Sequence, residues 1–379
     1  MNNAESGMAK LIDMHFHVGL IGDQYPRWGK MSAWYRRQLV YKMFLFYTRI
    51  KESRVSDKTL REETEKIIDS SIVDHVVCLA LDPVYDNDGN RREERSHMWV
   101  DNEYVLDLRR TLGKKVLLGA SVHPYDLDFK KRVNQYVEQG AVFIKWLPSS
   151  QHICLSDDRV KEALKYLATA KNNKPLPLLL HVGPEYAIPS SDTRTTSYDF
   201  LSWNWRDKLW NSFRGKNKWY QPQVKKIQEN LKAGLEEGAV IIFAHCGLPY
   251  FIPKFLKGVT GHSEFKTVKR YVEKYPPNSN FERRCYTDIS ACVTPFRKSY
   301  HSSIRTLPSD AVLFGSDLPT PVFELSANRK EMAQDLKEIF KGHFDRIIVP
   351  QDNLLDVNYR ELLHAFPGHA MFKNFNSLL

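Results

Sequence analysis

Features of membrane and secreted proteins are missing from this sequence. No apolar run approaches the roughly 20 residues that a membrane-spanning helix needs. The polar segment 1–10 has no apolar centre that would make it a secretory signal. The five cysteines are an odd number, lie far apart and form no C-x-x-C pair, which favours reduced thiols over a disulfide framework. We therefore expect a cytoplasmic protein.

Short apolar runs with the character of buried strands recur along the chain. They are rich in leucine and β-branched residues and show little polar alternation, as parallel strands buried on both faces do. The eight runs span 11–15, 72–81, 115–122, 141–147, 177–182, 239–245, 285–290 and 311–317. Helical periodicity lies between them, at 60–70, 102–112, 160–170, 224–236 and 327–340. This alternation predicts an α/β fold, a (β/α)8 barrel of the TIM type.

A doubly wound open sheet is the structural alternative, since periodicity alone does not separate the two architectures. A glycine-rich dinucleotide-binding loop is absent after the first run, which argues against that alternative. A TIM barrel takes about 250 residues, so this chain of 379 residues has many to spare. They fall mainly at about 20–60 and 184–222. Without linker composition or an internal repeat, we expect one domain over 1–379, with a core of about 11–365.

Histidine and aspartate side chains stand at the carboxyl ends of the predicted strands. The first strand ends with His15-Phe16-His17, and His181, His245 and Asp317 stand at the ends of the fifth, sixth and eighth strands. Barrel active sites form at these strand ends, and residues i and i+2 of a strand face the same side. Each residue alone would fit a structural role, but their order along the chain favours convergence. We predict His15, His17, His181 and Asp317 as ligands of one metal ion with an open position for water.

Motifs surround these residues in the segments IDMHFHVG, FIKWLP, LLLHVG, FAHCG and LFGSDLP, and the tail reads NLLDVNYRELL. Over about residues 11–365 the chain resembles the amidohydrolase superfamily, specifically its amidohydrolase-related branch of hydrolases and decarboxylases. The resemblance implies that a bound metal lowers the pKa of a water molecule. It also implies that Asp317 is both metal ligand and general base, and that His245 orients the water or polarises the scissile group.

Lys145, at the end of the fourth run, bears on the number of metal ions. In binuclear relatives a lysine at this place is carboxylated and bridges two metals, and the histidine that matches His245 joins the second. The alternative is an ordinary ammonium group that binds a substrate anion, because a bare cation beside a dication is unfavourable without an anion between them. We expect one essential ion, with two as the alternative. Three imidazoles and a carboxylate suit Zn²⁺ best, and Mn²⁺, Fe²⁺ or Co²⁺ are admissible.

Positive charge and tryptophan gather in the two insertions. The chain has a net charge of +10, and segments 21–60 and 205–226 each carry +6, so the remainder is slightly acidic. On the barrel prediction, Arg36, Arg37 and Arg206 belong to a lid over the mouth that attracts an anionic small molecule. Aromatic packing or a homo-oligomer interface is the alternative for these insertions.

Hydrolysis of an amide, ester or lactone by a metal-activated water is the reaction that we predict first. The alternative is a lyase reaction, the non-oxidative decarboxylation of an aromatic or unsaturated carboxylic acid by the same ligands. A non-catalytic basic protein that binds membranes or nucleic acid is a third hypothesis. Such a protein has no need of polar residues at the strand ends in the order that a metal site requires. We therefore expect that this protein binds neither membranes nor nucleic acid. The sequence leaves the substrate and its binding residues open.

Overall fold

Eight parallel strands form the central sheet. The computed structural model describes residues 9–183, 187–188, 201, 220–248, 264–277, 283–319, 334, 337–338, 341 and 351–379. The strand order is β1-β3-β7-β8-β9-β10-β11-β12. These strands are β1 (Ile12–His17), β3 (His75–Leu79), β7 (Val116–Ala120), β8 (Ala141–Trp146), β9 (Leu178–Leu180), β10 (Ile241–Phe243), β11 (Cys285–Asp288) and β12 (Val312–Leu313). The backbone of His17 donates to Leu318 at 2.8 Å, beyond β12, and thereby joins the two ends of the sheet into a barrel.

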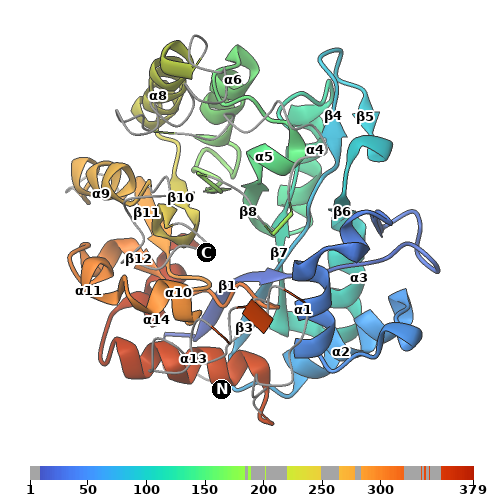
Figure 1. Ribbon diagram of the computed structural model, residues 1–379. Helices are drawn as coiled ribbons and strands as arrows, with labels where there is room; N and C mark the ends of the chain where they lie inside the picture. The colour runs from blue at the N-terminus through green and yellow to red at the C-terminus, as the bar shows by residue number, and fades with distance from the viewer. Residues whose placement is uncertain are drawn as a thin grey trace, which may run out of the picture.

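Helices surround the strands as an outer ring (Figure 1). The longer ones are α2 (Asp57–Asp69), α3 (Asn102–Leu112), α4 (Phe129–Glu138), α6 (Asp158–Leu167), α8 (Tyr220–Glu236), α9 (Phe265–Lys274) and α13 (Leu354–Ala365). The shorter ones are α1 (Leu39–Tyr47), α5 (Pro148–Gln151), α10 (Pro295–Lys298), α11 (His301–Ile304) and α14 (Met371–Asn374). Two antiparallel ladders lie outside the barrel and pair β2 (Gly29–Met31) with β6 (Met98–Val100) and β4 (Val84–Tyr85) with β5 (Arg91–Arg92). The predicted barrel is confirmed.

Each of the eight predicted runs overlaps one barrel strand, and β1 extends two residues beyond its run. Four of the predicted helices correspond to α2, α3, α6 and α8. Most of the stretch 327–340 and most of the insertion 184–222 lie outside the described residues. None of the described helices is long and apolar enough to cross a membrane.

The core consists of two apolar clusters on opposite sides of the strands. Leu179 belongs to the smaller cluster, whereas its neighbours Leu178 and Leu180 belong to the larger one. This alternation is that of a strand with one face toward the barrel interior and the other toward the helices. Phe375 and Leu378, near the end of the chain, pack into the smaller cluster in the barrel interior.

A β-bulge in β1 changes the direction in which its side chains point. The register of β1 against β3 shifts between Asp13 and Phe16, so Met14 and His15 together stand opposite one residue of β3. A bulge of this kind interrupts the regular alternation of faces and re-aims the side chains beyond it. Met14 therefore packs in the barrel interior, and both His15 and His17 turn into the mouth above it, where their Nε2 atoms are 3.3 Å apart.

Candidate metal centre

The ring nitrogens of His15 and His17 meet the carboxylate of Asp317 at the barrel mouth. Asp317 Oδ1 lies 3.1 Å from His17 Nε2 and 3.4 Å from His15 Nε2. Asp317 follows β12 in a left-handed backbone conformation, with φ +61°, and its amide donates to the His15 carbonyl at 2.7 Å. A non-glycine residue in this conformation is uncommon and is over-represented at functional sites. The first and last strands of the barrel thus bring three predicted ligands together.

His245 and His181 complete the group of predicted site residues. His245 follows β10 within the turn Ala244–Gly247, also at a positive φ of +54°. Its ring centroid lies 4.9 Å from that of His15 and 5.2 Å from that of His181. Ligand atoms of His15, His245 and Asp317 all lie within 4.8 Å of one another. A group of possible metal ligands therefore includes His245, which the sequence placed beside the metal, together with two of the predicted ligands, His15 and Asp317.

Asp288 and Ser290 hold two of these imidazoles in place. Asp288, the last residue of β11, faces His15 Nδ1 at 3.0 Å through Oδ2 and accepts the backbone N–H of His245 at 3.0 Å through Oδ1. The Ser290 hydroxyl lies 2.7 Å from His245 Nδ1. Burial alone would raise the pKa of Asp288, but the charge and hydrogen bond of His15 hold it well below its usual range. A carboxylate behind an imidazole fixes the tautomer that leaves Nε2 for a metal.

Lys145 lies beside His17. It is buried, 2% exposed, and its Nζ is 3.2 Å from His17 Nδ1. Burial first, and then the Lys145 charge, lower the pKa of His17 to about 4. His17 is therefore a neutral imidazole at neutral pH, which is the form that binds metal ions. The buried Lys145 side chain thus places its Nζ atom beside the cluster.

The turn that carries Asp317 is fixed from two sides. Ser316 donates through its backbone N–H to Asp13 at 2.9 Å and through its hydroxyl to the same carboxylate. Asn358, from α13, donates to the Ser316 carbonyl at 3.2 Å. Gly315 has no room for a side chain, because a Cβ there would lie 2.7 Å from the Cβ of His15. Through Asn358, which lies in the tail segment NLLDVNYRELL, these contacts connect the tail helix to the site.

The spacing of the three closest donor atoms fits a shared cation. Ligand atoms at about 2.0–2.2 Å from one transition-metal ion lie roughly 2.8–3.6 Å apart in octahedral or tetrahedral geometry. The measured distances among His15 Nε2, His17 Nε2 and Asp317 Oδ1 are 3.1, 3.3 and 3.4 Å. At such distances the two ring nitrogens and the anionic oxygen need either a shared proton or a cation between them. The donor set therefore suits a divalent ion in both spacing and chemistry.

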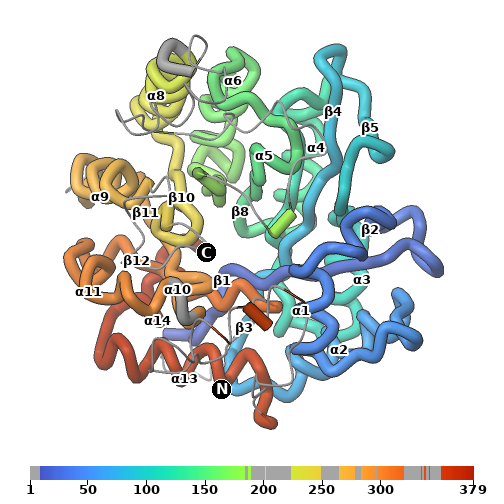
Figure 2. Tube along the Cα trace, in the orientation of Figure 1, coloured from blue at the N-terminus to red at the C-terminus, as the bar shows by residue number. Residues whose placement is uncertain are grey.

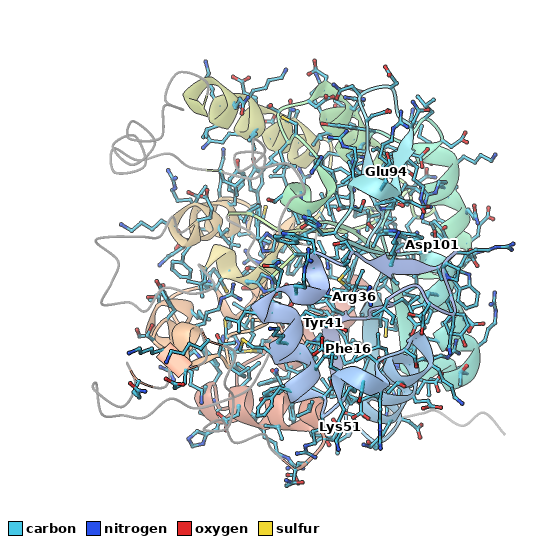
Figure 3. All side chains as sticks on the ribbon, turned by 45° about the vertical axis from the view of Figure 1, so that its right-hand side comes forward. Phe16, Arg36, Tyr41, Lys51, Glu94 and Asp101 are labelled. Carbon is cyan, nitrogen blue, oxygen red and sulfur yellow. The ribbon has the colours of Figure 1, made fainter. Side chains whose placement is uncertain are left out.

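An apolar cavity of about 130 Å³ opens onto this cluster, with His17 and Asp317 in its wall. Much of the remaining wall comes from the insertion 20–60, including Tyr35 and Tyr41, and Figure 3 labels Tyr41 together with Phe16, another residue of the wall. The first insertion therefore does reach the mouth. It contributes apolar side chains to the cavity.

The arginines predicted for the lid have a different place. Arg36 and Arg37 are both exposed on the short 3₁₀ helix Tyr35–Arg37, and neither belongs to the cavity wall. Arg206 and four of the tryptophans in the second insertion lie outside the described residues. Trp34 stacks on His97 at 4.2 Å between ring centroids and is 40% exposed. Among the described residues, the cavity wall is thus mostly apolar, and the exposed arginines do not contribute to it.

Comparisons with known proteins give matches among solved structures. No protein-family model matches the chain, and no curated protein matches it. The structure is similar to apo IDCase of Metarhizium anisopliae (TM-score 0.49, 14% identity, 97% of each chain covered). It is also similar to amidohydrolase 2 of Bifidobacterium longum subsp. infantis (TM-score 0.43, 14% identity, 98% of this chain and 97% of that one).

A third similar structure is 5-carboxyvanillate decarboxylase of Novosphingobium aromaticivorans, which was solved with bound manganese (TM-score 0.43, 13% identity, 94% of this chain and 99% of that one). The similarity in all three cases extends along nearly the whole chain. The barrel itself is established by the order and closure of the eight strands.

Proposed function

We propose that this protein is a metal-dependent enzyme of the amidohydrolase type. His15, His17, His181 and Asp317 would hold one divalent ion, with His245 beside it. The proposal depends on one observation, the mutual distances of 3.1, 3.3 and 3.4 Å among three donor atoms at the barrel mouth. Zn²⁺ fits three imidazoles and a carboxylate best, and Mn²⁺ is the next choice. When bound, such an ion polarises substrate oxygens and stabilises the negative charge that develops on them.

The substrate that suits this site is a carboxylic acid with an apolar body. The buried ammonium of Lys145, 3.2 Å from His17, provides positive charge close to the cluster, and the cavity beside His17 is mostly apolar in its wall. An anionic head and an apolar body match these two surroundings. This assignment keeps the anionic substrate expected from the sequence but transfers the charge recognition from the exposed arginines to the buried lysine and the metal.

The first reaction that we propose for such an acid is non-oxidative decarboxylation. The bond between the carboxyl carbon and its neighbour breaks, the electron pair stays on that neighbour, and a proton replaces the CO₂ that leaves. The proton comes from solvent, and His245 and Asp317, which both face the cluster, would relay it: the ionised Asp317 carboxylate accepts the proton before passing it on. This choice reverses the order of the two reactions expected from the sequence, because an apolar cavity favours loss of a charged group over entry of water.

Hydrolysis of an amide, ester or lactone is the second candidate. The observation that favours it concerns the charge of Asp317. Burial would raise the pKa of this carboxyl group, but the neighbouring His245 and the hydrogen bond from His17 hold it well below its usual range. Asp317 is therefore ionised at neutral pH, as a group that accepts a proton from water must be.

A panel of substrates separates the two reactions. Purified protein with added Zn²⁺ or Mn²⁺ is assayed for CO₂ release from alkanoic, unsaturated and aromatic acids, among them 5-carboxyvanillate, and for acid release from esters, amides and lactones. We expect CO₂ release from at least one acid. Hydrolysis without any CO₂ release would reverse the order of the two candidates. Absence of both reactions in metal-loaded protein would overturn the proposal that the site is catalytic for these classes.

A further inference from the structure

The cavity at the cluster continues away from it between two helices. Its wall begins at His17 and Asp317 and ends among residues of α1, α2 and the start of α13. α1 lies beside α2 on the same side of the barrel (Figure 2). We refer to this space between α1 and α2 as the α1–α2 channel. It is continuous with the space in which the reacting group of a substrate would lie.

The length of the channel can be estimated from α2. Leu60, Thr64 and Ile67 all line it, at the i, i+4 and i+7 spacing of one helix face. At about 1.5 Å per residue, seven residues extend about 10 Å along the helix axis. Phe44 on α1 and Leu354 at the start of α13 line the channel as well. The wall therefore extends over about two turns of α2, which offers a short chain contacts along that helix.

The side chains of Thr48, Thr64 and Glu63 in this wall already have partners close to them in the chain. The Thr48 hydroxyl donates to the Phe44 carbonyl at 3.0 Å, and the Thr64 hydroxyl donates to the Leu60 carbonyl at 2.8 Å. Glu63 is the charged residue of the α2 wall, and its carboxylate pairs with Lys66 at 3.5 Å. The described wall thus offers methyl groups, methylenes and ring faces to a ligand. Such a wall binds through apolar area.

We propose that the α1–α2 channel binds an unbranched apolar tail of the substrate, an alkyl chain of about six to eight carbons. An extended alkyl chain advances roughly 1.3 Å per carbon, given C–C bonds of about 1.5 Å at tetrahedral angles. Eight carbons therefore cover the 10 Å along α2. The carboxylate at the head of this chain lies at the cluster, so this inference rests on the proposed function. The substrate class is a medium-chain acyl compound: an ester or amide of the straight-chain acid for hydrolysis, or an acid with a double bond beside its carboxyl group, which takes up the electron pair, for decarboxylation.

Binding of straight-chain acids tests the length of the channel. Isothermal titration of metal-loaded protein with the series from butanoic to dodecanoic acid, below the concentrations at which they form micelles, gives a Kd for each. We expect the Kd to fall about fourfold per added methylene up to about the octanoic acid and to change little beyond it. A Kd that does not depend on chain length, or benzoic acid binding more tightly than octanoic acid, would overturn the inference.

Two variants should change, in opposite directions, the chain length at which the affinity stops increasing. Thr64→Phe fills the channel and should end the gain in affinity at a shorter chain, whereas Phe44→Ala should extend it to a longer chain. Glu62→Phe is the matched control, since it adds the same ring to α2 at a side chain that is 62% exposed and outside the wall. If Thr64→Phe and Glu62→Phe give the same chain-length series, the channel does not bind the tail.

The same titration separates the tail site from the metal site. Repeated on a His15→Ala/His17→Ala variant, the chain-length dependence should persist while every acid binds more weakly, because the tail contacts remain and the head contacts are lost. Chain-length dependence in a wild-type protein that binds no metal would leave the channel standing and refute the proposed function. Metal binding and turnover without chain-length dependence would refute the channel alone.

Discussion

The two regions of the barrel mouth are built in different ways. The histidine cluster comes from strand ends that belong to the barrel itself, and its side chains are held by buried partners such as Asp288 and Ser290. The α1–α2 channel comes largely from an insertion, and its wall offers apolar surface. In barrels of this kind the strand ends supply the chemistry, and added loops supply the specificity. The difference predicts that changes in the cluster alter turnover and metal content, whereas changes in the insertion alter which substrate binds.

The largest effect is expected at Asp317. Asp317→Asn keeps the size of the side chain but removes a ligand charge and a proton acceptor, so turnover should fall roughly 10²- to 10⁴-fold. The melting temperature should stay near that of the wild type, because the residue contributes little to apolar packing. Steady-state kinetics and thermal unfolding measure the two quantities. Asp352→Asn, at an exposed ion pair with Arg360, is the control, and an Asp317→Asn enzyme as active as this control would show a capping role instead.

The next effect concerns the pH dependence of stability in metal-free protein. The pKa of His17 is lowered from 6.5 to about 4 by burial and by Lys145. Between these pH values the unfolded chain binds more protons than the folded one, so stability falls as the pH falls from 6.5 through 4. The shift corresponds to at most about 3 kcal/mol. Urea unfolding at pH 4, 5.5 and 7 measures it.

In His17→Gln this part of the pH dependence should be missing. A His17→Gln protein with the same loss of stability at low pH as the wild type would place the dependence on other groups. His123, which is buried against the Gln151 carbonyl at 2.9 Å and has its pKa lowered by burial to about 3, remains in both proteins and contributes equally.

A smaller effect is expected behind the cluster. Asp288→Asn weakens the group that orients His15 without removing a ligand, and loss of such a partner typically lowers metal affinity about 10- to 100-fold. Competition with a chromophoric chelator measures the Kd for Zn²⁺. Ser290→Ala, which removes the hydroxyl beside His245, should change the affinity less. Equal Zn²⁺ affinity in Asp288→Asn and wild type would mean that Asp288 only supports the fold.

The smallest effect is expected at the exposed arginines of the insertion. Arg36→Glu/Arg37→Glu reverses two charges that lie outside the cavity wall, and exposed charges are screened within ~8 Å at physiological ionic strength. We expect kcat/KM to change less than about threefold, with kcat unchanged. Measurements of kcat/KM from low to high salt test this expectation. A large, salt-dependent loss of kcat/KM would support the charged lid that the sequence suggested. It would also contradict an apolar channel as the main determinant of substrate binding.

Much of the fold follows from the sequence because the strands are short, apolar and evenly spaced. The H-x-H motif, His181, His245 and Asp317 could be placed at strand ends from this pattern alone. The bulge at Met14 and His15 could not, since it depends on the register against β3.

The sequence also could not predict that Tyr35 is buried and Arg36 is exposed, because this depends on how a 3₁₀ turn packs onto the barrel. For the same reason the sequence suggested a charged lid where the described insertion presents an apolar wall. The orienting link from Asp288 to His15 joins residues 273 positions apart and becomes visible only in three dimensions.

Metal content shows whether His15, His17, His181 and Asp317 bind an ion. Protein purified without chelator, or loaded with Zn²⁺ and dialysed, is analysed for transition metals together with the His15→Ala/His17→Ala variant. We expect about one ion per chain in the wild type and almost none in the His15→Ala/His17→Ala variant, which should still fold. A folded double variant that retains a full equivalent of metal, or a wild-type protein that binds none after loading, would contradict it.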